Sequence, residues 1–209
     1  MDTETLWLII RSAVSLTALG TMVAFMMHRN FKQYRETKRI NFARLLMALS
    51  FFFSILSHML KLGYYGMQIQ LLDGWIGEGI QEFTANTVFT CLTIMFSSTF
   101  AAYINKWDAF VLFPAFIFIG AFIMNILVPE IAFLSYYIMT FGTISMIALF
   151  EAGIRLKDNM ALGIGIYSLL NLITSFLSLY YAITLSMIGL IFAAITVAGL
   201  FRPFGKQGV

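Results

Sequence analysis

The amino-acid sequence predicts an all-α polytopic membrane protein, a seven-transmembrane-helix bundle with its N-terminus outside and its C-terminus in the cytoplasm. Three observations predict this fold: the composition, the number of long apolar runs and the placement of the basic residues. Hydrophobic residues make up 60% of the 209-residue chain and charged residues only 11%, against about 25% charged residues in an average soluble domain. The mean hydropathy is +0.88, which indicates a chain that lies mostly in lipid.

The long apolar runs define the expected membrane spans. A helix needs about 20 mostly apolar residues to cross a hydrocarbon core roughly 30 Å thick. The N-terminal segment "MDTET" is acidic, whereas a secretory signal begins with basic residues, so the first run is expected to be a retained helix. Little chain is left between the runs, so residues 1–209 are predicted to form a single domain. The seven expected spans are residues 6–27, 42–63, 76–104, 109–128, 131–150, 160–180 and 183–201.

The placement of Lys and Arg orients this bundle, because short cytoplasmic loops are enriched in these residues. With seven spans, eleven of the thirteen Lys and Arg residues fall on one side, five of them in the connection 28–41. That side is expected to be cytoplasmic, with the chain integral to the cell (plasma or cytoplasmic) membrane. The basic loop 28–41 has two interpretations: a topology signal alone, or a patch that binds lipid headgroups or a membrane or cytoplasmic protein partner.

Arg11 and Lys61 are the two basic residues outside this pattern, and both fall in the outer halves of their spans. At 1.5 Å per residue, Arg11 and His58 are expected about 9 Å below the outer boundary, with Lys61 less deep. Glu78 and Glu82 are four residues apart at the start of the third span, so they share a helix face. Because the second and third spans are antiparallel neighbours, Glu82 is expected to meet His58, and Glu78 to meet Lys61.

This charge cluster has two interpretations. An ionisable group inside a membrane is costly unless it is paired, and by default it marks a functional site, so the cluster predicts a ligand-binding or proton-handling pocket. Alternatively, the pairs only fix the second span against the third, while the long basic side chains extend toward the headgroups. The pocket interpretation assigns six residues to the site: Arg11, His58, Lys61, Glu78, Glu82 and Asn86.

Polar residues continue from the cluster along one face of several spans, at helical spacing. They either line a wet cavity or form interhelical hydrogen bonds, each worth about 1 kcal/mol or less. For Ser and Thr we favour hydrogen bonding, because these side chains also bond to their own helix; Asn86 and Asn171 indicate a polar interior more strongly. The Ser and Thr positions are Ser12, Ser15, Ser50, Ser54, Ser57, Thr90, Thr93, Ser97, Ser168, Thr174, Ser175 and Ser178.

Small residues gather in the last two spans. The segments "ALGIGIYS" and "GLIFAAITVAG" are rich in Gly and Ala, and small residues let membrane helices approach closely. We interpret both segments as helix-packing surfaces, with homodimerisation as the alternative.

The composition excludes several classes of function. The seventh span, 183–201, contains no lysine, so it cannot form the Schiff base of a retinal pigment. One cysteine, Cys91, and two histidines, His28 and His58, are too few for a metal-dependent hydrolase, a bis-His haem or an iron–sulfur site. The sequence shows no catalytic motif, so we expect neither an enzyme nor a cofactor. The net charge of +3 follows from topology, so no nucleic-acid partner is expected.

The first span, the basic connection and the segment "NFARLLMALSFFFSIL" resemble the start of the seven-helix membrane input domains of prokaryotic sensor kinases. The likeness is one of layout along the whole chain, and no binding residue is carried over from it. It implies a small or lipophilic ligand bound within the bundle. Because the chain ends at Val209 without a kinase or other output domain, it also implies a separate output partner.

Three functions are consistent with these features. The first is a receptor or sensor-like protein that binds a small ligand in an outer-side polar pocket between the first three helices. The second is a small transporter or proton-linked permease that uses the same cluster; seven spans fit the 3+1+3 layout of sugar transporters built from three-helix repeats. The third is a structural subunit of a larger membrane complex. Transport requires the cytoplasmic half of the bundle to open, whereas a sensor requires a pocket closed on that side.

Overall fold

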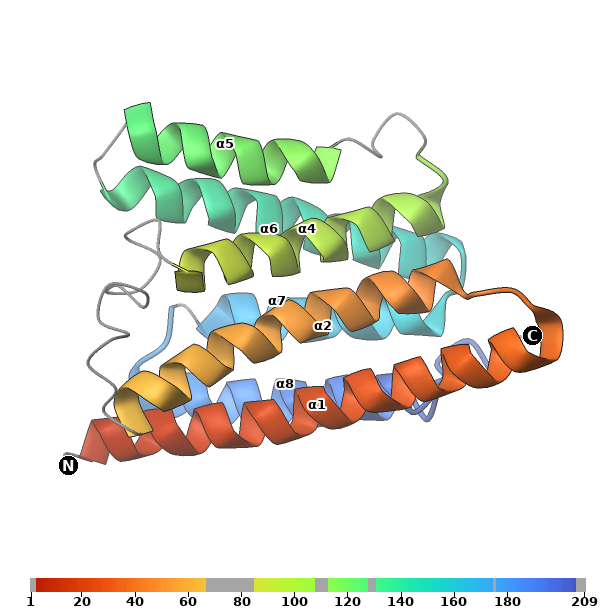
Figure 1. Cartoon of the computed structure of the whole chain (residues 1–209), viewed down its shortest axis with the longest axis horizontal. Helices are drawn as coiled ribbons and strands as arrows, with labels where there is room; N and C mark the ends of the chain where they lie inside the picture. The colour runs from red at the N-terminus through yellow and green to blue at the C-terminus, as the bar shows by residue number, and fades with distance from the viewer. Residues whose placement is uncertain (1–2, 67–84, 108–112, 128–130, 175, 206–209) are drawn as a thin grey trace.

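A computed structural model describes residues 3–66, 85–107, 113–127, 131–174 and 176–205, and within these ranges the chain is helical without any strand. The first helix, α1 (Thr3–Thr37), is followed by α2 (Phe42–Lys61) and one π-helical turn, η1 (Leu62–Gly66). The remaining helices are α4 (Ala85–Asn105), α5 (Phe113–Leu127), α6 (Ile131–Arg155), α7 (Asn159–Thr174) and α8 (Leu179–Val197). Successive helices run in opposite directions, as Figure 1 shows.

Five of these helices are long and apolar enough to cross a membrane, which supports the predicted class of membrane protein. Within the described residues α7 has 16 residues and α5 has 15, against the roughly 20 that a complete crossing needs; residues 108–112 and 128–130, on either side of α5, lie outside the described part of the chain. The five long segments are Thr5–Thr37, Phe42–Tyr64, Val88–Asn105, Tyr136–Arg155 and Tyr180–Val197.

The connection 28–41, expected to be a loop, is helical as far as Thr37. Residues 21–37 contain neither Gly nor Pro, so nothing in the sequence ends the helix where the apolar run ends. Basic side chains in this extension also lie over aromatic rings four residues earlier. The Arg29 guanidinium carbon is 4.8 Å from the ring centroid of Phe25, and that of Arg35 is 5.9 Å from the ring centroid of Phe31.

A second difference lies between the last two helices, since the expected span 160–180 corresponds to a helix that ends at Thr174. Ser178 has extended backbone angles and is the N-cap of α8. Ser is favoured at helix N-caps because its side chain competes with regular helical hydrogen bonding. The sequence is apolar on both sides of this turn, so hydropathy alone does not separate the two helices here.

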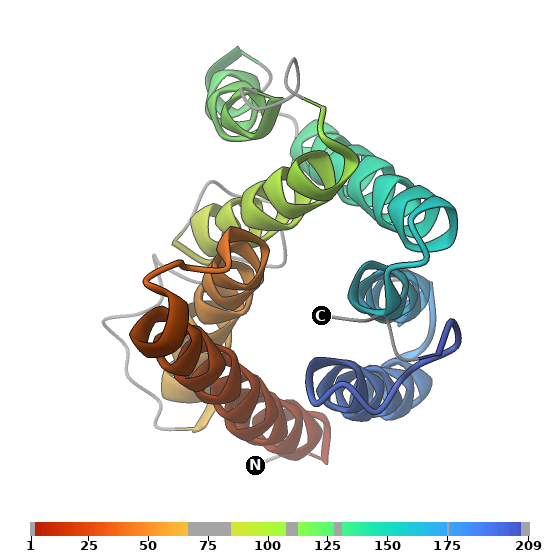
Figure 2. The ribbon, with the colours of Figure 1, turned by 90° about the vertical axis from the view of Figure 1, so that its right-hand side faces the viewer.

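Six helices form a closed ring, and the seventh lies outside it. Each ring helix packs against the next in the order α1, α2, α4, α6, α7 and α8, and α8 packs against α1. α5 packs against α4 and α6. Figure 2, a view along the bundle, shows α5 at the edge, behind the seam between these two helices. The ring therefore encloses a central space that α5 does not reach.

Close helix packing occurs at two glycines, of which Gly163 lies in a segment that the sequence analysis selected and Gly153 does not. A Cβ atom added at Gly153 on α6 would lie 2.6 Å from the backbone nitrogen of Leu162 on α7. A Cβ atom added at Gly163 on α7 would clash with the side chain of Thr196 on α8. The interpretation of the two Gly- and Ala-rich segments as packing surfaces is thus confirmed at the α7–α8 contact, where Gly163 of one segment meets Thr196 of the other.

The two ends of the ring differ in charge. We call the end where α1 stops and α2 starts the basic end, and the opposite end the Arg11 end. Alternating helix directions place every described Lys and Arg except Arg11 and Lys61 at or near the basic end. The two groups of Lys and Arg that the sequence analysis separated therefore lie at opposite ends of one bundle.

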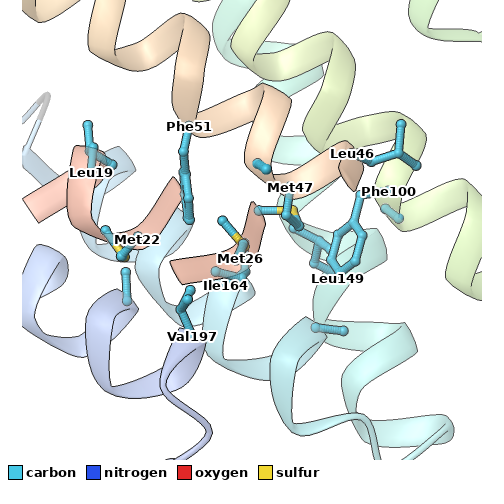
Figure 3. Close-up of a cluster of buried hydrophobic side chains, with 14 of the residues drawn as sticks. Leu19, Met22, Met26, Leu46, Met47, Phe51, Phe100, Leu149, Ile164 and Val197 are labelled. Atoms are coloured by element: carbon cyan, nitrogen blue, oxygen red, sulfur yellow. The ribbon is translucent and has the colours of Figure 1, made fainter. Parts of the chain in front are cut away.

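The half of the ring toward the basic end is filled by apolar side chains, drawn in Figure 3. All six ring helices contribute to this group, which we call the core cluster. Its members are almost completely shielded from solvent, because each fills the space between neighbouring helices. Its larger members are Leu19, Met22, Met26, Leu46, Met47, Phe51, Phe100, Leu149, Ile164, Leu190 and Val197.

Candidate functional site

A polar cavity of about 320 Å³ lies inside the ring, between the core cluster and the Arg11 end. Its volume is at the lower end of the roughly 300–1,000 Å³ typical of small-molecule sites. All six ring helices line it, and α5 does not. The polar side chains of the wall are Arg11, Ser15, Ser50, Ser54, His58, Thr90, Thr93, Ser97, Ser145, Tyr167, Ser168, Asn171 and Ser186.

The floor of this cavity is apolar. Met47, Phe51, Ile164 and Leu190 line the cavity and also belong to the core cluster. The cavity therefore ends where the core cluster begins, and it is closed toward the basic end.

Arg11 and His58 bring ionisable nitrogen atoms into the cavity wall. Within the described part of the chain, Arg11 Nε and His58 Nδ1 are buried and have no hydrogen-bond partner. Lys61 lies one turn beyond His58 on α2, and it is close enough to both Arg11 and His58 to interact with them electrostatically. The structure thus brings together the three basic members of the predicted cluster.

The other three predicted site residues are not placed. Glu78 and Glu82 lie outside the described residues, and Asn86 is on α4 with a side chain that is likewise not described. The expected pairs of Glu82 with His58 and of Glu78 with Lys61 therefore stay predictions.

The Ser and Thr side chains of the wall divide into two groups. Ser50 Oγ donates a hydrogen bond to the backbone oxygen of Thr93, 2.9 Å away, and so links α2 to α4. Thr93 and Ser145 donate to carbonyls one turn earlier in their own helices. Ser50 and Thr93 follow the favoured interpretation as hydrogen-bonding groups, and Ser145 is a wall residue that the sequence analysis did not select.

Five serines of the wall form the second group. Within the described residues no hydrogen bond involves their hydroxyls. A Ser in a helix commonly bonds to the carbonyl of the preceding turn. These five hydroxyls do not make that bond, so they remain available to a molecule in the cavity. They come from five of the six ring helices: Ser15, Ser54, Ser97, Ser168 and Ser186.

Tyr167 on α7 is a wall residue that the sequence analysis missed. Its ring packs edge-on against Phe51, with the centroids 6.0 Å apart, and it lies within electrostatic range of Arg11. Asn171, one turn later, donates to the backbone oxygen of Tyr167 at 3.1 Å. Ile164, Tyr167, Ser168 and Asn171 follow the spacing i, i+3, i+4, i+7 of a single helix face. Extending the predicted polar stripe by one turn would have included Tyr167.

A second hollow, of about 660 Å³, lies on the exposed face between α1 and α8. No ionisable side chain is among its lining residues, which include Ala13, Phe25 and Ala194. The hydroxyls of Thr17 and Thr21 there bond to carbonyls of α1. This hollow therefore lacks the available polar groups that distinguish the central cavity.

The basic end is held by hydrogen bonds between the ring helices. Asn41 is the N-cap of α2 and accepts a hydrogen bond from Arg44 N at 3.0 Å. Asn30 Nδ2 on α1 donates to the backbone oxygen of Asn41 at 3.2 Å. Arg44 also donates to Gln33 Oε1 on α1, 3.4 Å away. These contacts hold α1 and α2 together below the floor of the cavity.

The chain matches no protein-family model, and no curated protein and no solved structure is similar enough to identify a relative. The function is therefore argued from the cavity and the side chains that line it.

Proposed function

We propose that this chain is an integral membrane receptor or sensor-like protein that binds a small ligand in the cavity inside its helical ring. The observation that carries this proposal is a cavity whose wall combines two ionisable side chains, Arg11 and His58, each with a buried nitrogen that has no hydrogen-bond partner among the described residues, with five available serine hydroxyls. Buried polar groups in proteins are normally hydrogen-bonded, and several unpartnered groups around one cavity are characteristic of a ligand site.

The closed floor favours a receptor over a permease. A permease must let its substrate leave on the opposite side, which here would require the tightly packed core cluster to separate. A receptor needs only a pocket with one closed side and a surface for an output partner. The helical extension of α1 from His28 to Thr37 offers such a surface, because it carries exposed basic and aromatic side chains.

The orientation and the number of crossings belong to the same proposal. We assign seven crossings, with the Arg11 end outside and the basic end in the cytoplasm. Support comes from the concentration of described Lys and Arg at one end and from the enrichment of these residues in cytoplasmic loops. In this assignment α5 and α7 also cross the membrane.

A thermal-stability screen tests the binding function. The full chain, purified in detergent, is heated with small anions, amino acids, sugars and lipids. A ligand that binds only the folded chain stabilises it by mass action, by about 2.7 kcal/mol at one hundred times its dissociation constant. We expect at least one class of compound to raise the melting temperature in a saturable way.

Two blocked variants and a matched control locate the binding. Ser168→Leu and Ser54→Leu add bulk to opposite walls of the cavity, whereas Ile188→Phe adds bulk on a face of α8 where residue 188 is 52% exposed. We expect the ligand-induced shift to disappear in the Leu variants and to persist in Ile188→Phe. A screen without any shift, or a shift that both Leu variants retain, would contradict the proposal and favour a structural subunit. Uptake of the ligand into proteoliposomes would assign a permease instead.

A further inference from the structure

We propose that the ligand is a small organic carboxylate, with its anionic group between Arg11 and His58 and its polar middle at the serine hydroxyls. This inference rests on the proposed binding function and names the ligand class for the same cavity. It is argued from the charge of the wall, the available hydroxyls and the apolar floor.

The charge of the wall calls for an anion. A guanidinium stays protonated in proteins, and an unpaired cation within a membrane is destabilising by several kcal/mol. The structure gives Arg11 no hydrogen bond or ion pair within the described residues, although its Nε is buried. His58 faces the same cavity, and Lys61 adds positive charge close to both. An anionic group in the cavity would compensate this charge directly.

The described acidic side chains do not supply that anion. Glu36, Glu151 and Asp158 all belong to the basic end, and none lines the cavity. Glu78 and Glu82, the acidic residues that the sequence analysis placed in the site, lie outside the described residues, as do Asp2, Asp73, Asp108, Glu130 and the side chain of Glu4. The experiment below therefore includes variants of Glu78 and Glu82.

A carboxylate fits these donors better than a spherical ion does. Arg binds a carboxylate through two parallel N–H groups, which adds direction as well as charge. Ser15 follows Arg11 by four residues on α1, and Ser54 precedes His58 by four residues on α2. Both serines are therefore about 6 Å from the cations along the bundle, on the side of the floor. Hydroxyls at this level both donate and accept, which suits a hydroxyl or amide group next to the carboxylate.

The far end of the ligand meets the floor. Met47, Phe51, Ile164 and Leu190 present only apolar atoms there, so a short hydrocarbon end is the matching group. The volume of about 320 Å³ limits the ligand to metabolite size. The order along the cavity, from the nitrogen donors of Arg11 and His58 to the hydroxyls and the apolar floor, thus corresponds to a carboxylate, a polar middle and an apolar tip.

Matched pairs of acid and amide test this inference in the full chain. The probes are straight-chain carboxylates from acetate to decanoate, 3-hydroxybutyrate and N-acetyl-L-leucine, each beside its primary carboxamide, with chloride and inorganic phosphate as simple anions. Melting temperatures and calorimetric dissociation constants are measured at fixed pH and ionic strength. We expect at least one carboxylate to bind saturably while its carboxamide binds at least about tenfold more weakly, because the two differ only in the charge-assisted hydrogen bonds.

Variants assign the anionic group to its partners. Arg11→Gln should weaken carboxylate binding by on the order of 10- to 100-fold and leave carboxamide binding unchanged. Arg11→Lys keeps the charge but loses the two-pronged donor and should give an intermediate loss. His58→Asn should weaken the same probes. Arg35→Gln removes an exposed charge on the α1 extension and is the matched control, for which we expect no change.

The outcomes separate this inference from the binding function. Neutral sugars or amides that bind and are blocked by Ser168→Leu would keep the binding function and overturn the carboxylate. Phosphate or chloride acting as strongly as every carboxylate would also overturn it. So would carboxylate binding that appears only in Glu78→Gln or Glu82→Gln, because a side chain of the protein would then occupy Arg11. No binding by any compound would contradict both proposals.

Discussion

Arg155 at the end of α6 donates a hydrogen bond to Asn105 Oδ1 at the end of α4, with the two atoms 2.5 Å apart. Asn105 is only 8% exposed, and its amide nitrogen donates to the backbone oxygen of Ala101 at 3.1 Å and of Ala148 at 3.3 Å. One buried amide thus joins α4 and α6 by two hydrogen bonds, to Ala148 and from Arg155. Arg155 also forms an ion pair with Glu151, so this ion pair is connected to the buried Asn105.

We expect Asn105→Leu to destabilise the protein by about 1–3 kcal/mol, because it removes the two hydrogen bonds that join α4 to α6. The free energy of unfolding in mild detergent measures the effect. Glu151→Gln is the control: that side chain and Arg155 are 42% and 50% exposed, and exposed pairs contribute about 0–1 kcal/mol. Equal losses in the two variants would contradict the structural role given to Asn105.

Two glycines offer a second matched comparison. Gly153 faces the backbone of α7, with Leu162 N 2.6 Å from an added Cβ, whereas nothing lies within 4 Å of a Cβ added at Gly20 on α1. We expect Gly153→Ala to be destabilising by about 1–3 kcal/mol, because backbone atoms have to move apart. Gly20→Ala should be neutral or stabilising by up to about 1 kcal/mol through helix propensity. The melting temperatures of both variants test this prediction. A Gly153→Ala variant as stable as Gly20→Ala would contradict the close backbone contact between α6 and α7 at Gly153.

The positions of the helices were largely predictable, because apolar runs of membrane length are helical in lipid. The expected span 42–63, for example, coincides with α2 and the turn that follows it. The extension of α1 to Thr37 was not predictable from hydropathy, which reports the lipid-embedded part of a helix and not its end. The order of the helices around the ring was not predictable, for a related reason. An apolar side chain that faces lipid is the same in sequence as one that faces a neighbouring helix.

The candidate site was predictable where charge marked it. Arg11, His58 and Lys61 stand out because ionisable residues within apolar runs are rare. The pocket was expected between the first three helices, whereas the cavity is lined by six, with α7 and α8 contributing residues such as Tyr167 and Ser186. Single polar residues on apolar helices carry little information by themselves, so only the ring geometry shows that they meet.

The α1 extension leads to a third expectation. Residues 28–37 are helical, so their amides bond to carbonyls one turn earlier, and we expect their hydrogen exchange to be slow compared with that of 40–41. Exchange measured by mass spectrometry on the full chain in nanodiscs tests this. Lys32→Pro should abolish the protection, because Pro removes a helical donor and clashes with the preceding turn. Ile40→Pro lies in the connection after Thr37 and should leave the protection of residues 28–37 unchanged. Equally fast exchange over the whole of 28–41 would contradict the helical extension and support the loop that the sequence predicts there.

The floor of the cavity provides a fourth expectation. Phe51 is almost fully buried and packs against Tyr167, so Phe51→Ala should be destabilising by about 3–5 kcal/mol through the lost contacts and the new void. Met47→Leu conserves volume at the neighbouring floor position and should change stability by less than about 1.5 kcal/mol. Chemical unfolding in mild detergent measures both. A Phe51→Ala variant as stable as Met47→Leu would indicate a loosely packed floor, and the argument for a receptor over a permease would lose its support.

The proposed orientation leads to the last expectation, which uses the single cysteine of the chain. Cys91 is 0% exposed, so after Cys91→Ser one new cysteine at either end of the bundle reports its side of the membrane. We expect Thr3→Cys to react with a membrane-impermeant maleimide in intact cells, because α1 starts at the Arg11 end. Gly205→Cys follows α8 at the basic end and should react only after the cells are permeabilised. Reaction of both cysteines from the same side would require an even number of crossings, and one of the short helices, α5 or α7, would then lie at the membrane surface. Reaction in the reverse order would place the cavity on the cytoplasmic side, where its ligand would be an internal metabolite.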